Sequence, residues 1–360
     1  MKSVILLCAI VGLAIAGSSF DARQKWPSCV KNILNQGSCG SCWAFAAHEC
    51  FADLLCIYKD VDSIIIASPE PCIDCTRNGC NGNTADTAWK YLINDGTTTC
   101  TDLCEKGCEP TYSANTGVGG TCPSNHECYQ SSSDWPSLYK ASSYKMLPKG
   151  GINDYENALN DGTLQAWFQV YNSFYSFFDK NPDGIYTKSD VSGAYVGNHF
   201  IKFVGYGSSS GTNYWICANS WGTSWGDKGY FKMEKGINLC GIENYVYQGF
   251  VAGEKSSRDV AVPLNNNATL EAPVAGHWVG QEDLEDVLVQ EAVSAALDLL
   301  NKKNTEVKPF VFKNVIKAET QVVAGLNIHL HLQMVGATVD LVIHRDLENN
   351  YRLDRFDVLW

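Results

Sequence analysis

The feature that most constrains this chain is its sixteen cysteines among 360 residues. Disulfides persist in exported proteins and are rare in the cytosol, so this number favours a fold stapled by disulfides in an oxidising compartment. If Cys8 and Cys42 are set aside for the reasons given below, fourteen cysteines remain, an even number available for pairing. Spacing alone does not determine which cysteines pair.

Residues 1–17 are typical of a cleavable signal peptide. Lys2 is followed by the apolar run Val4–Ala16 and then by the small residues Gly17-Ser18-Ser19. The run has 13 residues, fewer than the roughly 20 that span a bilayer as a helix. We therefore expect entry into the secretory pathway, a final place in a lysosome or vacuole or outside the cell, and no membrane span.

Composition limits the classes of function and the number of domains. A hydrophobic content of 45% is ordinary for chains that bury a core, and the length predicts about two or three domains. The net charge of −12 and the isoelectric point near 5.0 leave no basic patch to neutralise phosphates. Nucleic acid is therefore not an expected partner.

The character of the sequence changes near residue 252. Residues 18–252 are rich in cysteine, glycine and aromatic residues, whereas residues 253–273 are polar and irregular and predict an exposed linker. The linker contains Asn267-Ala268-Thr269, which is an acceptor triplet for N-glycosylation. The sequence thus divides after the signal peptide into a first domain, a linker and a C-terminal domain at 274–360.

The C-terminal domain has its own hydrophobic pattern. Apolar residues at three- and four-residue steps predict an amphipathic helix over 281–301. Alternation with β-branched and aromatic enrichment predicts four strands, at 311–318, 322–335, 339–345 and 351–359. One helix on an antiparallel sheet is the expected layout, so the fold class of the whole chain is α+β.

Cys42 is the candidate nucleophile. The segment Gln36-Gly-Ser-Cys-Gly-Ser-Cys42-Trp-Ala-Phe45 passes from a glycine-rich turn into residues that favour a helix. Cys42 would therefore lie at or beside a helix N-terminus, where unpaired N–H groups and the helix dipole lower a thiol pKa. The sequence predicts a thiolate at this position.

A base and its orienting residue follow far along the chain. His199 is expected at the start of a strand that includes Lys202–Tyr206, and Asn219 follows the strand-like run Asn213–Ala218. An asparagine amide can accept the imidazole N–H and leave the other ring nitrogen to face the sulfur. Gln36 can donate its amide to a developing oxyanion, beside the backbone N–H of Cys42.

These motifs resemble the papain-like cysteine peptidases, and their cathepsin B branch in particular. The branch resemblance rests on Phe20-Asp-Ala-Arg-Gln-Lys-Trp-Pro27, Gly107-Cys-Glu-Pro110 and Cys240-Gly-Ile-Glu243, and the likeness covers about residues 20–250. It implies a two-lobe fold with a helical left lobe and a β-barrel-like right lobe. It also implies the disulfides Cys39–Cys80 and Cys29–Cys56, and a site that needs no cofactor and no metal.

The resemblance assigns roles to individual residues. Cys42 becomes the nucleophile, His199 the general base and acid, Asn219 the orienting residue and Gln36 the oxyanion donor. The expected substrates are peptides or proteins. The residues expected to line the substrate cleft are Gly82, Asn83, Asn198, Phe200, Trp221 and Tyr245.

The sequence departs from the family pattern in ways that bear on substrate and regulation. Asn83 replaces the second glycine of Cys-Asn-Gly-Gly, Phe200 replaces a small residue, and Tyr245 replaces an acidic residue at the floor of the S2 pocket, which predicts a preference for apolar P2 side chains. The loop between Cys108 and Cys128 keeps one histidine, His126, which favours endopeptidase over carboxydipeptidase activity. Between the signal peptide and Phe20 there is no room for the family's propeptide.

The C-terminal domain resembles a cystatin, an inhibitor whose wedge enters papain-like clefts. The wedge would consist of the segment around Gly276, a hairpin at Gln321-Val322-Val323-Ala324-Gly325, and a second hairpin at Asp346–Asn350 with Leu347 as its apolar tip. We hypothesise that this domain docks on its own cleft or on that of another papain-like peptidase. A short linker raises the effective concentration of a tethered domain to about the millimolar range.

Three alternatives stay open at this point. Cys39-Gly-Ser-Cys42 could be a redox pair, or half of a zinc site completed by Cys72-Ile-Asp-Cys75. The hairpin could be structural, in an unrelated accessory domain. The chain could also be a secreted inhibitor whose peptidase half only presents the cystatin-like wedge.

Overall fold

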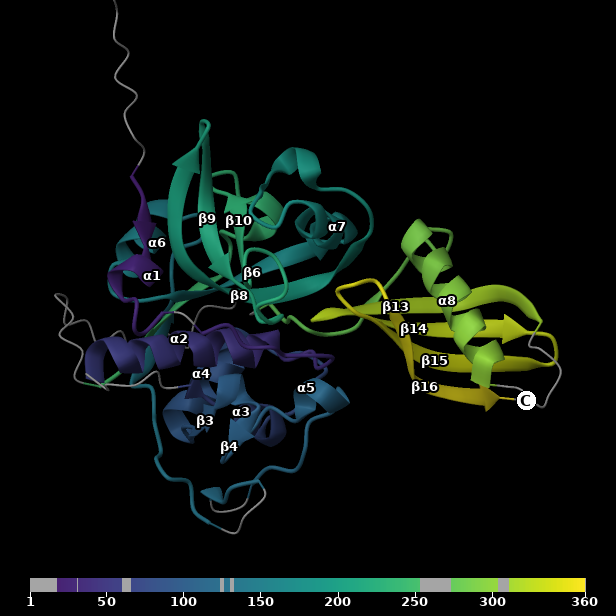
Figure 1. The fold of residues 1–360 in the computed structure, drawn as a ribbon, viewed down its shortest axis with the longest axis horizontal. Helices are drawn as coiled ribbons and strands as arrows, with labels where there is room; N and C mark the ends of the chain where they lie inside the picture. The colour runs from purple at the N-terminus through teal and green to yellow at the C-terminus, as the bar shows by residue number, and fades with distance from the viewer. Residues whose placement is uncertain are drawn as a thin grey trace, which may run out of the picture.

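The structure is a computed structural model that describes residues 18–30, 32–59, 66–123, 126–129, 133–252, 273–303 and 311–359. The expected signal peptide lies outside these residues, as does the expected linker apart from Pro273. Two lobes at the N-terminal end and one C-terminal layer of helix and sheet make up the described chain (Figure 1). The expected fold class, α+β with a papain-like part followed by a helix on an antiparallel sheet, is confirmed.

The left lobe is built around one buried helix. This helix, α2 (Cys42–Lys59), is covered on nearly all sides, as its run of alanines, cysteines and aromatic residues requires. Helix α4 (Ala85–Asn94) packs against it and begins at a Thr84 side chain that accepts a hydrogen bond from the Thr87 N–H. The remaining elements of the lobe are α3 (Glu70–Cys75), α5 (Ser113–Thr116), the 3-10 turn η1 (Asp102–Cys104) and a small sheet of β2 (Ile66–Ala67), β3 (Thr99–Thr101) and β4 (Lys106–Gly107).

The right lobe is an eight-stranded sheet that carries the candidate histidine and asparagine. Its order is β5-β11-β6-β8-β9-β10-β7, and β1 pairs with β8 off this path. The strands are β1 (Phe20–Asp21), β5 (Ser143–Met146), β6 (Leu164–Tyr171), β7 (Ile185–Tyr186), β8 (Tyr195–Ser209), β9 (Thr212–Ala218), β10 (Tyr230–Glu234) and β11 (Val246–Phe250). The helices and 3-10 turns of the lobe are α1 (Ala22–Lys25), α6 (Ile152–Leu159), α7 (Asn172–Lys180), η3 (Lys188–Asp190) and η4 (Leu239–Gly241).

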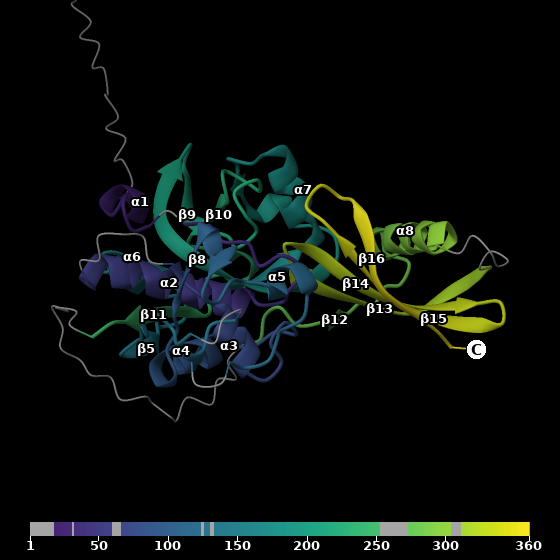
Figure 2. The same cartoon turned by 60° about the horizontal axis from the view of Figure 1, so that its bottom comes forward.

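The C-terminal part is a five-stranded antiparallel sheet crossed by one helix (Figures 1 and 2). The order β12-β13-β14-β15-β16 follows the chain. Its elements are β12 (Val279–Gly280), α8 (Val287–Lys303), β13 (Phe312–Val323), β14 (Gly325–Met334), β15 (Ala337–Arg345) and β16 (Tyr351–Leu359). Along β14, alternate residues from Leu326 to Met334 are buried, so one face of the sheet packs on α8 and the other stays open.

Two predicted boundaries in this part are wrong. Helix α8 begins at Val287 and not at Gln281, because Asp283 and Asp286 accept hydrogen bonds from nearby backbone N–H groups and hold a turn instead. The strand predicted over 322–335 divides at Ala324: β13 runs through Val323, and β14 starts at Gly325, whose φ of +108° suits glycine.

The described residues contain five disulfides. Cys29–Cys56 and Cys39–Cys80 pair as the resemblance implied, and Cys75–Cys122, Cys100–Cys104 and Cys108–Cys128 join them. The other described cysteines are unpaired thiols, namely Cys42, Cys50, Cys72, Cys217 and Cys240. The fourteen cysteines that remain when Cys8 and Cys42 are set aside are therefore not all in disulfides. The redox-pair and zinc-site alternatives are wrong, since Cys39 and Cys75 are already held by other partners.

No helix within the described ranges is long and apolar enough to cross a membrane. The right lobe and the C-terminal part share a buried core. One cluster of buried hydrophobic side chains contains Phe168 and Trp221 of the right lobe together with Val322 and Leu326 of the C-terminal sheet. The C-terminal part is thus packed against the face of the lobes where α2 begins (Figure 2).

Candidate active site

Cys42 is the first residue of α2, as the sequence predicts. The preceding turn is held by the Cys39–Cys80 disulfide and by a hydrogen bond from the Gly40 N–H to the Cys80 carbonyl at 2.9 Å. The thiol lies against the backbone N–H groups of Phe200 and Trp43. The nucleophile candidate is therefore beside the strand that carries His199.

The protonation of Cys42 differs from the prediction. Its side chain is fully buried, and this burial raises the pKa of the thiol from 9.0 to about 12, against the opposing effect of the neighbouring N–H groups. A neutral thiol is the result at physiological pH. The predicted low pKa fails because desolvation outweighs the helix N-terminus when the cleft is covered.

His199 lies within β8 and not at its start, since β8 extends back to Tyr195. Its Nε2 lies 2.8 Å from Asn219 Oδ1, and its Nδ1 is buried without a hydrogen-bond partner among the described residues. Burial lowers the pKa of His199 from 6.5 to about 4. The imidazole is therefore neutral and has one nitrogen held and one free to exchange a proton.

Asn219 follows directly after β9, as the sequence predicts. Its Oδ1 also accepts a hydrogen bond from the Ser220 N–H at 2.9 Å, so the amide has a fixed orientation. The indole of Trp221 covers the imidazole of His199, with ring centroids 5.0 Å apart. These contacts leave the His199 ring little freedom to turn.

Gln36 is buried at the other side of the turn. Its Nε2 donates to the Cys39 carbonyl at 2.9 Å, and its Oε1 accepts from the Ser220 hydroxyl at 2.7 Å. One amide hydrogen is used in this way and the second remains available. The backbone N–H of Cys42 belongs to the first turn of α2, where N–H groups have no intrahelical partner.

The predicted cleft residues bind a segment of the same chain. Asn83 and Ala275 exchange backbone hydrogen bonds at 3.0 and 3.1 Å, as two residues of paired strands do. The Gly276 N–H donates to the Asn198 carbonyl at 3.2 Å, and the Asn198 Nδ2 donates to the Val274 carbonyl at 3.1 Å. The segment 274–276 therefore lies in the cleft as an extended peptide would.

Gly82 makes this approach possible. A Cβ at Gly82 would lie 2.5 Å from the His277 nitrogen and 2.7 Å from the Ala275 oxygen. Phe200 is fully buried, and Tyr245 packs edge-on against Trp167 with ring centroids 5.4 Å apart. Phe200 belongs to the buried cluster that contains Ala275, and Tyr245 packs against that cluster, so aromatic surface adjoins the bound segment.

Comparisons with known proteins agree with this geometry. A family model described as papain family cysteine protease matches residues 16–250, and one described as cystatin domain matches residues 280–347. Cathepsin B-like CP2 of Giardia intestinalis is 36% identical over 235 residues, which cover 64% of this chain and 73% of that protein. The first match covers most of the chain. The chain belongs to the papain family of cysteine proteases.

Other relatives of this papain-family protease are also cathepsin-like. Cathepsin B-like cysteine proteinase 3 of Caenorhabditis elegans is 34% identical over 248 residues, which cover 64% of this chain and 65% of the relative, slightly less than two thirds of its length. The solved proCathepsin B S9 from Trypanosoma congolense superposes with a TM-score of 0.54 at 28% identity, covering 65% of this chain and 77% of that one. These relatives and the five disulfides indicate a protein of the secretory pathway.

The first wedge hairpin of the cystatin part lies against both lobes of the protease. Val322 and Val323 are fully buried, and the Ala324 N–H donates to the Gly37 carbonyl at 2.9 Å. Tyr175 on α7 donates its hydroxyl to the Gly325 carbonyl at 2.8 Å. The hairpin thus contacts the turn that precedes Cys42 on one side and the right lobe on the other.

Gln321 links two of the three parts of the wedge, the Gly276 segment and the first hairpin, to the Cys42 turn. Its Nε2 donates to the Cys80 carbonyl at 2.7 Å and to the Gly276 carbonyl at 2.8 Å. Gly276 has a φ of +73°, and a Cβ there would lie 2.3 Å from the Gly40 oxygen. Glycine is therefore required at this position for both conformation and space.

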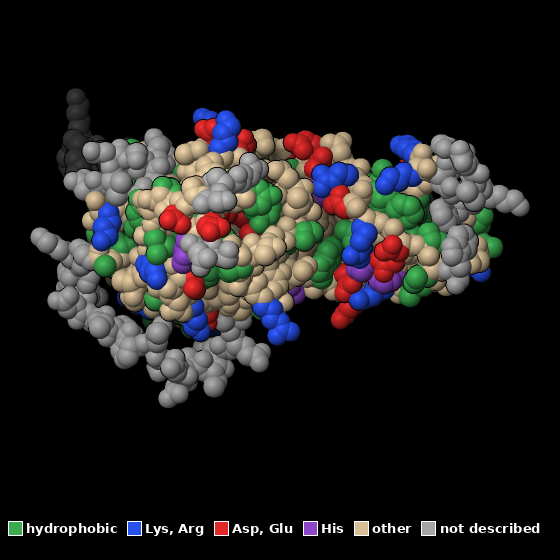
Figure 3. All heavy atoms as spheres, turned by 90° about the horizontal axis from the view of Figure 1, so that it is seen from below, with side chains coloured by type: hydrophobic (Ala, Val, Ile, Leu, Met, Phe, Trp, Pro, Cys, Tyr) green, Lys and Arg blue, Asp and Glu red, His purple; other side chains and the backbone are tan. Residues whose placement is uncertain are grey.

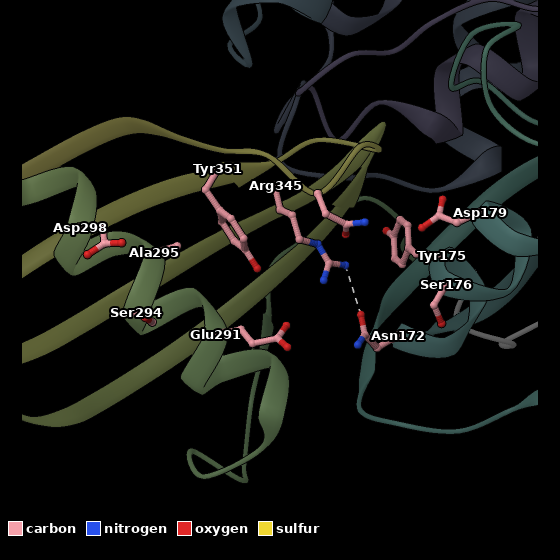
Figure 4. A pocket seen from close by; sticks show the side chains of 11 residues that line it. Asn172, Tyr175, Ser176, Asp179, Glu291, Ser294, Ala295, Asp298, Arg345 and Tyr351 are labelled. Atoms are coloured by element: carbon pink, nitrogen blue, oxygen red, sulfur yellow. Dashed lines mark hydrogen bonds between the residues drawn. The ribbon is translucent and has the colours of Figure 1, made fainter.

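The second hairpin also touches the protease. Asp346 and Asn350 close it through backbone and side-chain hydrogen bonds, and Leu347 packs against the cluster that contains Trp221. Next to it, Arg345 donates to the Asn172 Oδ1 at 3.1 Å across a cavity of about 670 Å³ between α7 and α8 (Figure 4).

Sequence reasoning missed four residues at this contact. Asn327 donates to the Ser38 carbonyl at 2.9 Å and to Gln321 Oε1 at 2.8 Å, and Thr320 donates to the Val196 carbonyl at 2.9 Å. Tyr175 and Ser38 complete the set. The available signal for Asn327 was a polar residue on the same strand face as the hairpin. Ser38 lies within the glycine-rich segment before Cys42 but makes its contact through its backbone carbonyl, and Tyr175 lies outside any motif.

Proposed function

We propose that this chain is a cysteine endopeptidase in which Cys42 attacks the peptide carbonyl and His199 exchanges the proton. The observation that carries the proposal is the state of the His199 ring: Asn219 holds Nε2, while Nδ1 is buried without a partner among the described residues, next to the residue whose N–H meets the Cys42 thiol. In space, the nucleophile is thus followed by the base and the base by its orienting group.

The reaction follows from these positions. When substrate displaces the bound segment, the Cys42 proton passes to His199 Nδ1, and the sulfur bonds to the carbonyl carbon. The Cys42 N–H and the free hydrogen of the Gln36 amide stabilise the oxyanion. His199 then gives its proton to the amine leaving group, and water, deprotonated by His199, releases the acyl group from sulfur.

For substrate recognition, we assign the backbone groups of Asn83 and Asn198 to the substrate's main chain, because they bind residues 274–276 in that manner. Gly82 leaves room for it. Tyr245, Phe200 and Trp221 give the cleft an aromatic lining, which fits apolar P2 side chains. His126 is exposed on the loop closed by Cys108 and Cys128, and one histidine is a weak anchor for a substrate carboxylate, so endopeptidase activity is favoured.

We further propose that the cystatin part, with the boundaries assigned at 274–360, inhibits the protease in cis. Supporting this are the hydrogen bonds of Ala275, Gln321 and Ala324 to Asn83, Cys80 and Gly37 of the left lobe, and the full burial of Cys42. A neutral thiol and a neutral imidazole do not attack amides efficiently. The linker keeps the inhibitor close, so release leaves it able to return. The final compartment we propose is a lysosome or vacuole, or the extracellular space.

The test is hydrolysis of fluorogenic peptides by the full chain. A Leu-P2 peptide should be cleaved faster than an Arg-P2 peptide, and Cys42→Ala or His199→Ala should abolish cleavage. A wild-type chain that never cleaves, even after the wedge is disrupted, while it inhibits another papain-like peptidase, would favour the scaffold-and-inhibitor alternative. Equal or faster turnover of the Arg-P2 peptide would contradict the assigned role of Tyr245.

A further inference from the structure

The open face of the C-terminal sheet carries a cluster of histidines and carboxylates that the protease mechanism does not use. On β14, the side chains of Ile328, Leu330 and Leu332 are buried toward α8, so His329 and His331 project from the opposite face. Figure 3 shows histidine side chains among acidic and basic ones over this part of the molecule.

Strand pairing brings two carboxylates to these histidines. Glu319 on β13 lies opposite His329, and Asp340 on β15 lies opposite His331. The four side chains therefore come from three adjacent strands and share one face. Residues directly opposite on an antiparallel pair have Cβ atoms about 5 Å apart, which is within reach of a shared ion.

Three of these side chains are close enough together to share one metal ion. One ligand atom each from Glu319, His329 and His331 lies within 4.8 Å of the others. His329 Nδ1 is 3.1 Å from Glu319 Oε2, and the two imidazole centroids are 4.6 Å apart. In a tetrahedral zinc site, with bonds near 2.0 to 2.2 Å, neighbouring ligand atoms stand roughly 3.4 Å apart. The widest pair of ligand atoms would therefore have to close by up to roughly 1.4 Å to reach this spacing.

We propose that Glu319, His329 and His331 form a binding site for a divalent transition-metal ion of the Zn²⁺ class. Two imidazole nitrogens and one carboxylate oxygen are the donor set that Zn²⁺ accepts with water in the fourth position. Asp340 acts behind them: its Oδ1 lies 2.7 Å from His329 Nε2, which leaves Nδ1 for the metal. Such a carboxylate behind a ligating imidazole fixes the tautomer of the ring.

The competing explanation is an ion pair without metal. A protonated His329 could bridge Glu319 and Asp340, since both of its ring nitrogens have carboxylate neighbours. That arrangement also pairs His331 with Asp340, since its Nδ1 stands 3.4 Å from Asp340 Oδ2. It does not use the short separation between the ligand atoms of Glu319, His329 and His331. Metal binding would use all four groups, three as ligands and Asp340 as the carboxylate behind His329.

The proposed site lies beside a tryptophan that can report metal binding and close to the wedge residue Gln321. Trp278 meets His329 edge-on, with ring centroids 5.8 Å apart, so an ion at His329 would alter its fluorescence. Glu319 is two residues from Gln321 on β13, and both line a cavity of about 920 Å³ between the cystatin part and the left lobe, together with Asp74. The ion would therefore sit at the edge of the inhibitory contact.

The test measures Zn²⁺ binding to the full chain in a Cys42→Ala background, which removes the catalytic thiol as a competing ligand. We expect one saturable Zn²⁺ per chain by calorimetry, a change in Trp278 fluorescence absent in Trp278→Phe, and a rise in thermal midpoint with Zn²⁺. Co²⁺ should give the visible absorption of a tetrahedral ion. His331→Ala and Glu319→Gln should abolish the site, and Asp340→Asn should weaken it about 10- to 100-fold.

The matched control is His126→Asn, which removes an exposed imidazole from the left lobe and should leave Zn²⁺ affinity unchanged. Absence of saturable binding up to about 100 μM, or binding that survives both His331→Ala and Glu319→Gln, would overturn the proposal. A His329→Gln variant that loses stability without any Zn²⁺ effect in the parent chain would assign the cluster to the ion pair. Folding of each variant is checked by its thermal midpoint without metal.

Discussion

Gln321 Nε2 lies 2.7 Å from the carbonyl oxygen of Cys80, the cysteine that is bonded to Cys39 in the turn before the nucleophile. The same nitrogen holds the Gly276 carbonyl, so one side chain joins two of the three parts of the wedge to the cleft. Because Gln321 is buried and donates both of its amide hydrogens here, it is the residue whose loss should loosen the inhibitor most.

Gln321→Ala should therefore activate the protease. Leaving the buried carbonyls without this donor costs the closed state about 1–3 kcal/mol, which corresponds to roughly a 5- to 150-fold larger open fraction. The measurement is the initial rate of Leu-P2 peptide hydrolysis. Gln333→Ala is the control, because Gln333 bonds Met334 and Ala337 at the far end of the same sheet. Equal rates for the two variants would contradict the role of Gln321.

Gly276→Ala should expel the segment that lies in the cleft. The new Cβ would meet the Gly40 backbone at 2.3 Å, and φ at this position is +73°. The amides of Asn83 and Ala275, which bond each other, should then exchange hydrogen faster. Gly280→Ala is the matched control, since a Cβ there meets nothing within 4 Å. Unchanged exchange in Gly276→Ala would show that the segment is not held by this contact.

Acid should open the cleft. In the closed state burial lowers the pKa of His199 from 6.5 to about 4, and burial also lowers the pKa of His277 and of His344 near the wedge. At these three histidines the closed state thus binds fewer protons than the open one. Their contribution to its stability is complete above about pH 6.5 and is lost as pH falls, toward 4 for His199, by up to about tenfold per pH unit for each histidine.

The pH prediction is measured as the rate at which an epoxide thiol inactivator labels the wild-type chain, divided by the rate for Gly276→Ala at the same pH. The division removes the pH dependence of the labelling chemistry itself. The ratio should rise between about pH 7 and 5. A ratio that is flat or falls with acid would show that these histidines do not couple to opening.

The left and right lobes are joined by a buried ion pair whose loss should destabilise the fold. Lys202 Nζ lies 2.9 Å from Asp53 Oδ2, and both side chains are almost fully buried. Lys202→Met leaves the Asp53 charge unpaired and should cost about 3–5 kcal/mol in the free energy of unfolding. Lys202→Met with Asp53→Leu should recover much of the loss in denaturant melts. A single variant as stable as wild type would contradict the prediction.

The positions of Cys42 and Asn219 were predictable because neighbouring residues in the sequence determine where their helix begins and their strand ends. The glycine-rich turn and the helix-favouring residues after it place Cys42 at the start of α2. Asn219 follows β9 for a similar reason, since the strand pattern ends at Ala218. The position of His199 within β8 was not predictable, because pairing with β6 extends the strand back to Tyr195, and pairing depends on distant residues.

The predicted pKa of the Cys42 thiol was wrong because it, too, depends on residues that are distant in the sequence. A helix N-terminus acts locally and lowers it, but burial in a cluster that includes Ala275, which is distant in the sequence, acts more strongly. The Gln321–Gly325 motif located the wedge, while Tyr175, which donates to the Gly325 carbonyl, lies in a segment without any motif. Side chains that only complete a tertiary contact leave no such pattern.

The central claim is that the C-terminal sheet keeps Cys42 unreactive in its own chain. The most direct measurement is the rate at which an epoxide thiol inactivator labels the intact chain at neutral pH, followed by mass spectrometry of the Cys42 peptide. The account predicts slow labelling of wild type, fast labelling when Gly276→Ala and Gln321→Ala are combined, and none in Cys42→Ala. Labelling of wild type and of the double variant at the same rate would contradict it.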